Sequence, residues 1–228
     1  MAKQRKQYSV RKTSQFNCWR TLFQFLVCTI GYMIRFKLVY RIEIHGVENI
    51  PKDNKYIVCP NHLSTLDPPL MVAIWPRSVS FMAKKELFDI PFLRWWIDWL
   101  GAFEVNRESL APSTVKTVKA IYESKWVMGM FPQGTRGVPG EIRGVTTGFA
   151  GLARLTKCDV LPVGILGTNE AKKIPFSGKI IVNIGKPIKV GKDSEEVKRQ
   201  WIKQIEELTG YKYTDTPTDA ETVNGGVN

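Results

Sequence analysis

Short apolar runs, each followed by a polar loop and a helical pattern, recur along most of this chain of 228 residues. The first run begins near residue 39, and the last helical pattern ends near residue 208. Alternating strands and helices are typical of α/β proteins, because crossover helices bring successive strands side by side and parallel. The sequence therefore predicts an α/β fold in which helices flank a mainly parallel central sheet.

Apolar periodicity places the individual elements. We expect strands at residues 38–45, 56–59, 79–82, 102–105, 126–131, 160–166 and a long one at about 179–190. We expect helical segments at residues 68–75, 84–88, 91–100, 111–124, 146–156 and 194–208. Residues 39–213 then form one α/β domain. The polar tail at 214–228 is rich in Gly, Asn and Thr and is predicted to be disordered.

Residues 1–38 form a separate predicted segment, distinguished by charge and hydropathy. The net charge is +12, and residues 1–41 hold nine basic and no acidic side chains, which leaves about +3 (12 minus 9) elsewhere. Within this segment, residues 21–34 are uncharged and mostly apolar. As a helix they would extend about 21 Å, less than the roughly 30 Å hydrocarbon core. We expect a basic N-terminal arm and a membrane-associating helix in the interface; a spanning helix and a buried core helix are the alternatives.

A basic arm also suits nucleic acid, but no aromatic side chains interleave with these bases and no nucleic-acid-binding module is recognisable. We therefore expect a membrane phospholipid surface, and no nucleic acid, as the partner. The four cysteines are scattered without a CxxC pair, which favours reduced thiols facing the cytosol over a disulfide framework. Cys59 and His62 lack further ligands nearby in the sequence, so we expect no metal site.

The stretch from Pro60 to Pro68 holds one of the two histidines, His62, with Asp67 five residues later. Pro60 closes a predicted strand, and Asp67 followed by Pro68 is typical of a helix start, with the aspartate as the cap. His62 should then lie in a loop at the carboxyl end of a strand, where ligands bind in open α/β sheets. The carboxylate can orient the imidazole as a general base, although a turn and a cap alone give the same pattern.

Two later strand ends carry side chains that suit an anion. Arg107 follows one predicted strand, and Gly134, Thr135 and Arg136 follow the next. Arginine binds phosphate through two hydrogen bonds, and glycine lets backbone N–H groups approach an anion closely. Because loops at one edge of a sheet converge, we expect these residues beside His62. The loop is not of the Walker type, and no Gly-x-Ser-x-Gly elbow supports a serine acyl-enzyme.

Together these blocks resemble the glycerolipid acyltransferases, most closely the bacterial lysophosphatidic acid acyltransferases (1-acylglycerol-3-phosphate O-acyltransferases). His62 and Asp67 match the family's signature of a histidine, four residues and an aspartate. The other blocks follow in the family order over roughly residues 39–190: Ala83 to Leu87, which includes Lys84, then Gly101 to Arg107, Phe131 to Arg136, and Val160 to Gly164.

The resemblance implies an acyltransferase that moves a fatty acyl group from an acyl-CoA or acyl-carrier protein thioester to the sn-2 hydroxyl of lysophosphatidic acid. The product would be phosphatidic acid, made for phospholipid biosynthesis at the cytoplasmic face of the cell membrane. His62 would act as the base and Asp67 as its partner, in a direct transfer that uses no cofactor. The implied substrate-binding residues are Arg107, Gly134, Thr135, Arg136 and Lys84.

One position departs from the family pattern. The third block usually has Glu before Gly-Thr-Arg, whereas this chain has Gln133, which keeps the shape and a hydrogen-bonding carbonyl but loses the charge. Two alternatives therefore stay open. One is the same chemistry on another acceptor, such as glycerol 3-phosphate or another lysolipid, and the other is a catalytically disabled membrane-binding relative.

Overall fold

A computed structural model describes residues 10–34, 38, 40–105, 112–170 and 178–215. A seven-stranded sheet has the strand order β1-β8-β7-β2-β5-β3-β4. Arg107 and most of the predicted disordered tail lie outside the described residues. The strands of the sheet are β1 (Tyr40–His45), β2 (Tyr56–Pro60), β3 (Val79–Lys84), β4 (Phe103–Val105), β5 (Val127–Gly129), β7 (Asp159–Leu166) and β8 (Gly178–Ile184).

Five neighbouring strands of the sheet are parallel, and the two at one edge oppose them. β2 pairs parallel with both β7 and β5, and β3 pairs parallel with both β5 and β4. β8 is antiparallel to β7, and β1 is parallel to β8. This arrangement confirms the predicted mainly parallel sheet and places β2 at its centre.

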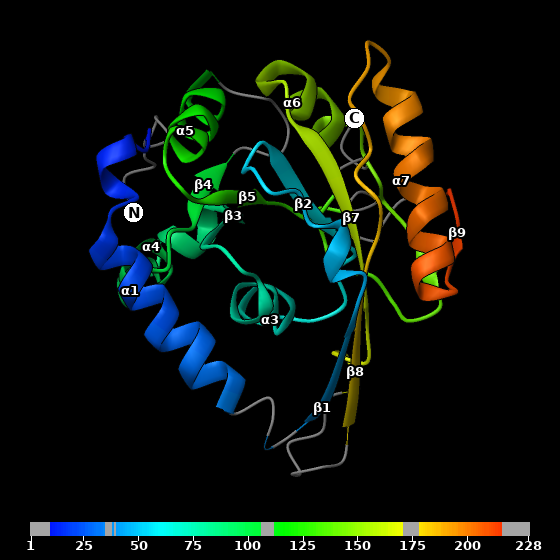
Figure 1. The fold of residues 1–228 in the computed structure, drawn as a ribbon, viewed down its shortest axis with the longest axis horizontal. Helices are drawn as coiled ribbons and strands as arrows, with labels where there is room; N and C mark the ends of the chain where they lie inside the picture. The colour runs from blue at the N-terminus through cyan, green and yellow to red at the C-terminus, as the bar shows by residue number, and fades with distance from the viewer. Residues whose placement is uncertain (1–9, 35–37, 39, 106–111, 171–177, 216–228) are drawn as a thin grey trace, which may run out of the picture.

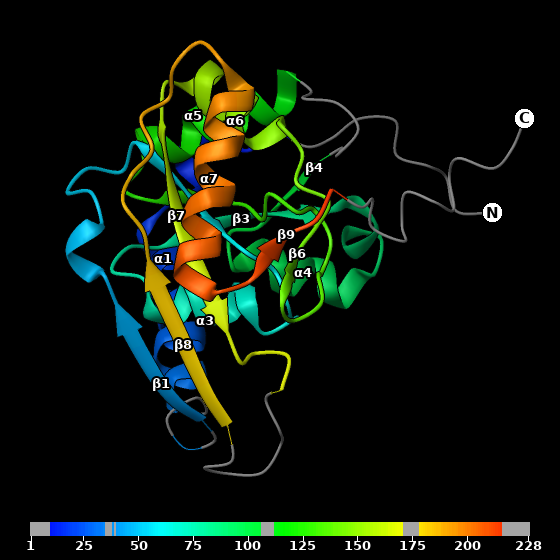
Figure 2. The same ribbon diagram turned by 90° about the vertical axis from the view of Figure 1, so that its right-hand side faces the viewer.

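Helices cover both faces of the sheet (Figures 1 and 2). α5, α6 and α7 lie on one side, while α3 and the N-terminal helix lie on the other, with α4 beside α1. The helices are α1 (Cys18–Gln24), α3 (Asp67–Ile74), α4 (Pro91–Trp99), α5 (Pro112–Glu123), α6 (Gly148–Thr156) and α7 (Ser194–Thr209), the π-helix η2 (Phe25–Tyr32), and the 3-10 turns η1 (Thr13–Gln15), η3 (Val47–Asn49) and η4 (Lys85–Phe88).

The alternation of side chains along β2 divides the core into two layers. Ile57 and Cys59 belong to the cluster under α5, α6 and α7, whereas Tyr56 and Val58 belong to the cluster under α3. All four side chains are fully buried. A strand buried on both faces reads as a continuous apolar run, which is why the sequence marks β2 so clearly.

α7 shows how local sequence sets an element. Its N-cap Asp193 accepts a hydrogen bond from the backbone N–H of Glu195 at 2.9 Å, and Gly210 ends the helix with φ 74°. Val197, Trp201 and Ile205 recur every four residues and form its buried stripe. The helix prediction at 194–208 is confirmed to within one residue.

The long strand predicted at about 179–190 is wrong in its extent, because β8 ends at Ile184. Gly185 and Pro187 interrupt it, and only Ile188 returns to pair with Val160 as an isolated bridge. Proline has no N–H for a ladder, so an apolar pattern that continues past it does not continue the strand. A short parallel pair, β6 (Glu141–Ile142) with β9 (Lys212–Tyr213), was not predicted.

The N-terminal helical segment is attached to the sheet. α1 continues into η2, and the buried amide of Gln24 donates to the carbonyls of Val79 at 2.8 Å and Leu100 at 2.7 Å, and accepts from the N–H of Val79 at 3.2 Å. Cys28, one turn further, is also buried. Within the described residues no helix has both the length and the apolar character needed to cross a bilayer.

Candidate active site

His62 lies just past the end of β2, at the middle of the sheet's carboxyl edge. Its backbone is held from both sides by the loop that follows β5. The N–H of His62 donates to Oε1 of Gln133 at 2.9 Å, and its carbonyl accepts from the N–H of Gly137 at 2.8 Å. The predicted location at a strand's carboxyl end is therefore confirmed, and the histidine backbone is fixed before its side chain makes any contact.

The His62 side chain contacts Asp67. Nδ1 of His62 lies 2.7 Å from Oδ2 of Asp67, whose side chain is fully buried. The carboxylate accepts hydrogen bonds, so Nδ1 carries the proton of a neutral ring and Nε2 keeps a lone pair. Nε2 has no hydrogen-bond partner within the described residues. The imidazole is 15% exposed, which leaves this nitrogen accessible to a substrate hydroxyl.

Asp67 is not a helix cap, contrary to the sequence prediction. Its Oδ2 also accepts the backbone N–H groups of Leu63 and Ser64, both at 2.7 Å, and these precede the helix rather than open it. α3 begins at Asp67 itself without a side-chain cap and relies on proline in its first turn. The carboxylate is therefore committed to the histidine loop.

The second oxygen of Asp67 is held by a residue that sequence reasoning missed. The hydroxyl of Thr168 donates to Oδ1 at 2.6 Å, and Thr168 is buried. Its sequence separation from Asp67 is 101 residues, so no local motif contains both. Only the strand order could have indicated this contact, because Thr168 follows β7 and the carboxyl end of β7 lies beside that of β2.

Asn61 and Ser64, which flank His62 in the same loop, make structural contacts. The amide of Asn61 donates to the carbonyl of Ile165 at 3.0 Å and accepts from its N–H at 2.6 Å, which joins the end of β2 to β7. The hydroxyl of Ser64 accepts the N–H of Leu66 at 3.3 Å within the loop. Neither side chain is free to do chemistry.

An aromatic stack supports the imidazole. The rings of His62 and Phe131 are 4.0 Å apart and 22° from parallel, and Phe131 stacks in turn on Phe81 at 5.2 Å. The stack restricts rotation of the histidine ring about its χ2 bond. The sequence alone does not indicate this contact, because a phenylalanine at a strand end is ordinarily a core residue.

Gln133 links two loops. Its Oε1 accepts the N–H of His62, and its Nε2 donates to the carbonyl of Arg143 at 3.3 Å. The side chain is only 4% exposed. A carboxylate there would have no proton to give to that carbonyl. The departure from the family pattern is thus accommodated by a contact that only the amide can make.

In the loop after β5, the backbone N–H groups of Gly134 and Thr135 already donate within the loop. Gly134 adopts φ 68°, and its N–H donates to the carbonyl of Phe131 at 2.9 Å, while the N–H of Thr135 donates to that of Gln133 at 2.7 Å. The hydroxyl of Thr135 is buried without a hydrogen-bond partner among the described residues. The adjacent Arg136 is exposed.

Of the other two predicted binding residues, the structure places one. Lys84 is exposed at the carboxyl end of β3, which is separated from β2 by β5 alone. It therefore lies on the same edge of the sheet as His62. Arg107 lies outside the described residues.

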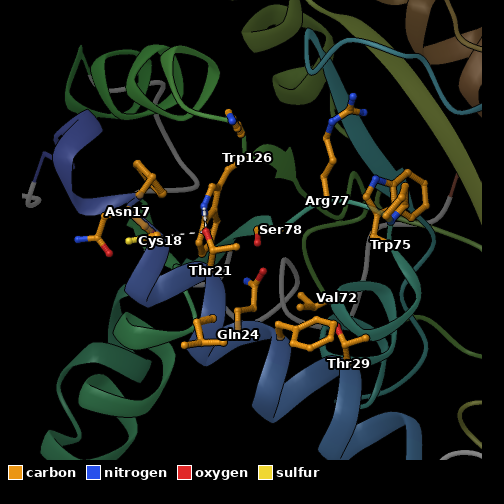
Figure 3. Close-up of a pocket in the computed structure, with 15 residues that line it drawn as sticks. Asn17, Cys18, Thr21, Gln24, Thr29, Val72, Trp75, Arg77, Ser78 and Trp126 are labelled. Atoms are coloured by element: carbon orange, nitrogen blue, oxygen red, sulfur yellow. Dashed lines mark hydrogen bonds between the residues drawn. The ribbon is translucent and has the colours of Figure 1, made fainter.

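The site is distinct from the groove drawn in Figure 3. This groove, of about 810 Å³, lies between α1–η2 and the end of α3, where Gln24, Thr29 and Val72 line it. Ser78 and Trp126 on its wall precede β3 and β5, so the groove is at the amino ends of these strands. None of the predicted site residues lines it.

A histidine–carboxylate pair at the carboxyl edge of a parallel sheet defines an α/β protein arranged for acid–base chemistry. A family model described as Acyltransferase matches residues 41–166, more than half of the chain. The chain belongs to this acyltransferase family. The matched span contains the histidine, the aspartate and the loop that follows β5.

Curated relatives and one solved structure agree with this family. The 1-acyl-sn-glycerol-3-phosphate acyltransferase of Bacillus subtilis is 30% identical over 64% of this chain and 73% of its own length. Those of Borreliella burgdorferi and Streptococcus pneumoniae are 33% and 31% identical over 63% and 75% of this chain, and over 59% and 63% of their own lengths. The crystal structure of the 1-acyl-sn-glycerophosphate (LPA) acyltransferase PlsC from Thermotoga maritima superposes with a TM-score of 0.66 at 25% identity, covering 84% of this chain and 80% of that one.

Proposed function

We propose that the protein transfers a fatty acyl group from an acyl thioester to the sn-2 hydroxyl of lysophosphatidic acid and so makes phosphatidic acid. The observation that carries this proposal is the contact between Nδ1 of His62 and Asp67, which leaves Nε2 as the base. The relatives named as 1-acyl-sn-glycerol-3-phosphate acyltransferases supply the acceptor. The donor is acyl-CoA or acyl-carrier protein, and the reaction needs no cofactor.

In this mechanism, Nε2 of His62 takes the proton of the acceptor hydroxyl as its oxygen attacks the thioester carbonyl. Asp67 stabilises the imidazolium that forms. The tetrahedral intermediate collapses and expels the thiolate, which takes the proton from the imidazolium and leaves as the free thiol. Cys59, three residues from His62, is poorly suited to act as a nucleophile, since complete burial raises the pKa of its thiol well above the ordinary value. Direct transfer is the simpler course.

The acceptor phosphate would bind to the side chains of Thr135 and Arg136, with Arg107 and Lys84 as further cations. A buried hydroxyl that lacks a protein partner suits a phosphate oxygen, and an exposed guanidinium can bind a second one. Gly134 would contribute through its left-handed conformation, which turns the chain at this point, rather than through its N–H.

The enzyme would act at the cytoplasmic face of the membrane, held by exposed apolar side chains of the N-terminal helical segment together with those of α4. Large apolar side chains on these helices are exposed: Trp19, Leu22, Phe25, Leu26, Ile30, Ile34, Phe92 and Trp95. Trp19 is 70% exposed and Phe92 77% exposed. Contiguous exposed aromatic and aliphatic side chains on helices are typical of interfacial binding, and the basic arm favours anionic lipid.

An acceptor profile tests the proposed reaction. The purified protein receives one radiolabelled acyl-CoA, or the same acyl group on carrier protein, with lysophosphatidic acid, glycerol 3-phosphate or lysophosphatidylcholine. We expect labelled phosphatidic acid with the first acceptor alone. Efficient labelling of another acceptor instead would support the same chemistry on that substrate. Absence of transfer to every acceptor would favour a catalytically disabled membrane-binding relative.

A further inference from the structure

The two oxygens of Asp67 have different surroundings. Oδ2 accepts three hydrogen bonds, from Nδ1 of His62 and the N–H groups of Leu63 and Ser64. Oδ1 accepts the hydroxyl of Thr168 at 2.6 Å. Because the carboxylate is fully buried, water does not replace a donor that is lost, and an oxygen without one is costly.

The position of Thr168 is set by the backbone immediately before it. Asn61 holds Ile165 at the end of β7 through two hydrogen bonds. Gly167 then turns the chain with φ 84°, and a Cβ on it would overlap the carbonyl oxygen of Lys179. Only glycine fits this turn without displacing β8. The chain that leads to Thr168 is therefore fixed at Ile165 and turned at Gly167, and this brings the Thr168 hydroxyl to Asp67.

We propose that Thr168 is a positioning residue for the reaction proposed above, acting through Asp67 on the general base. Rotation of the Asp67 carboxylate about its χ2 bond would exchange the surroundings of its two oxygens. The hydroxyl of Thr168 opposes this rotation and keeps Oδ2 against Nδ1 of His62. The carboxylate is then held in the orientation that stabilises the imidazolium during proton transfer.

The substitution Thr168→Val tests this role, since valine keeps the shape and removes the donor. We expect kcat to fall on the order of tenfold to a hundredfold, while KM for lysophosphatidic acid stays near the wild-type value. Thr168→Ser keeps the hydroxyl and should restore most of the rate. Wild-type kcat in Thr168→Val, measured per folded molecule, would overturn the proposal.

Thr117→Val provides a matched control. Thr117 is an equally buried threonine on α5, and its hydroxyl accepts the N–H of Arg11 at 3.0 Å, whereas that of Thr168 contacts Asp67. Both valine variants lose one buried hydrogen bond, and both should melt at a lower temperature. Only Thr168→Val should lose kcat. If the two variants lose rate equally, Thr168 has no more than a structural role.

A readout that needs no turnover separates this inference from the proposed function. The chain has two histidines, so the Nδ1 proton of His62 can be assigned by nuclear magnetic resonance with a His45→Ala variant. We expect a downfield Nδ1 proton signal in the wild type, its loss or shift in Thr168→Val, and its return in Thr168→Ser. An unchanged signal in Thr168→Val would contradict the positioning role even if no acceptor were acylated.

Discussion

Most of the candidate chemistry rests on one imidazole that is fixed at every polar group except Nε2. The backbone of His62 is bound on both sides, its Nδ1 contacts Asp67, and its ring stacks on Phe131. A base held in this way has little orientational freedom to lose when a substrate hydroxyl arrives, which is the entropic advantage of a preorganised site.

His62→Ala should therefore lower the rate of acyl transfer by about 10²–10⁴-fold, the usual contribution of a general base. The fold should survive, because the backbone contacts of residue 62 do not involve its side chain. His45→Ala is the control, since His45 is the other histidine and its side chain is 62% exposed. Turnover is measured for each variant, and circular dichroism on the same samples checks that the fold is kept. Equal activity of the two variants would remove His62 from the mechanism.

The proposed phosphate-binding role of Thr135 and Arg136 can be tested by measuring both the KM for the acceptor and the thermal stability of each variant. Thr135→Val removes a hydroxyl that has no partner within the described residues, so thermal stability should be kept or rise slightly. If the hydroxyl binds the acceptor phosphate, KM for lysophosphatidic acid should rise severalfold with kcat nearly unchanged. Arg136→Ala should do the same, more strongly. A matched control is Arg41→Ala, on an exposed arginine of β1. Unchanged KM in both site variants would place the phosphate elsewhere.

At the residue scale, the sequence alone indicates the pair but not its support. His62 and Asp67 lie five residues apart, so one motif contains both. Thr168 is far away in the chain, and Phe131 and Gln133 resemble ordinary core and turn residues. Local spacing cannot report contacts that depend on strand order. The wrong prediction that Asp67 caps a helix has the same cause. The loop geometry, which the sequence does not show, directs its carboxylate to the N–H groups of Leu63 and Ser64 instead.

Asp98 on α4 forms ion pairs with two arginines of the N-terminal segment. Its carboxylate lies 2.6 Å from Arg11 and 2.7 Å from Arg20, and both arginines are largely buried. Arg11 also donates to the carbonyl of Ala102 at 2.5 Å. The N-terminal segment is thus fixed on one α4 carboxylate as well as by Gln24.

Asp98→Asn should destabilise the protein by about 1–2 kcal/mol, because the carboxylate is partly exposed and screened. Burial opposes ionisation of Asp98, but its hydrogen bond to Arg20 and the charge of Arg11 outweigh it and lower its pKa from 3.8. Burial lowers the pKa of Arg11, but an arginine guanidinium still stays charged throughout the acid range, so Asp98 sets the pH dependence.

The sign of the effect follows from the lowered pKa. The stabilisation is complete above the ordinary pKa of an aspartate and is lost as the pH falls below it. Urea unfolding of the wild type and Asp98→Asn should therefore differ at neutral pH and converge below about pH 3.8. A gap between the two proteins that widens in acid would contradict this assignment.

The sequence predicts the ends of an element well when a strand is buried on both faces or when a helix has one buried stripe. β2, α5 and α7 are predicted to within a residue or two. β8 is predicted too long because Gly185 and Pro187 stop the ladder while the apolar pattern continues. β6 and β9 are two residues each, which is too short for periodicity to register.

At the scale of the whole molecule, the exposed apolar face of α1–η2 and α4 is the surface to test for membrane binding. Removing residues 1–38 would also remove the Gln24 contacts with β3, so loss of binding would be ambiguous. Substituting exposed positions avoids this. Trp19→Ser combined with Phe92→Ser should reduce binding to anionic phosphatidylglycerol vesicles at least tenfold, since each change removes a large apolar side chain from the interface.

Leu155→Ser is the matched control for this experiment. Leu155 is 53% exposed on α6, which covers the opposite face of the sheet (Figure 1). Sedimentation with vesicles should not distinguish this variant from the wild type. If the double variant also binds normally, the membrane surface lies elsewhere on the molecule.

The support for the catalytic pair has a consequence for synthesis on the ribosome. β2 and α3 emerge early and carry both His62 and Asp67, but Ile165 and Thr168 emerge about a hundred residues later. Until β7 pairs with β2, the nascent chain holds the pair without the partners that orient it. Catalytic competence should therefore appear late and abruptly during translation, and C-terminally truncated chains that end before β7 should be inert even where α3 has folded.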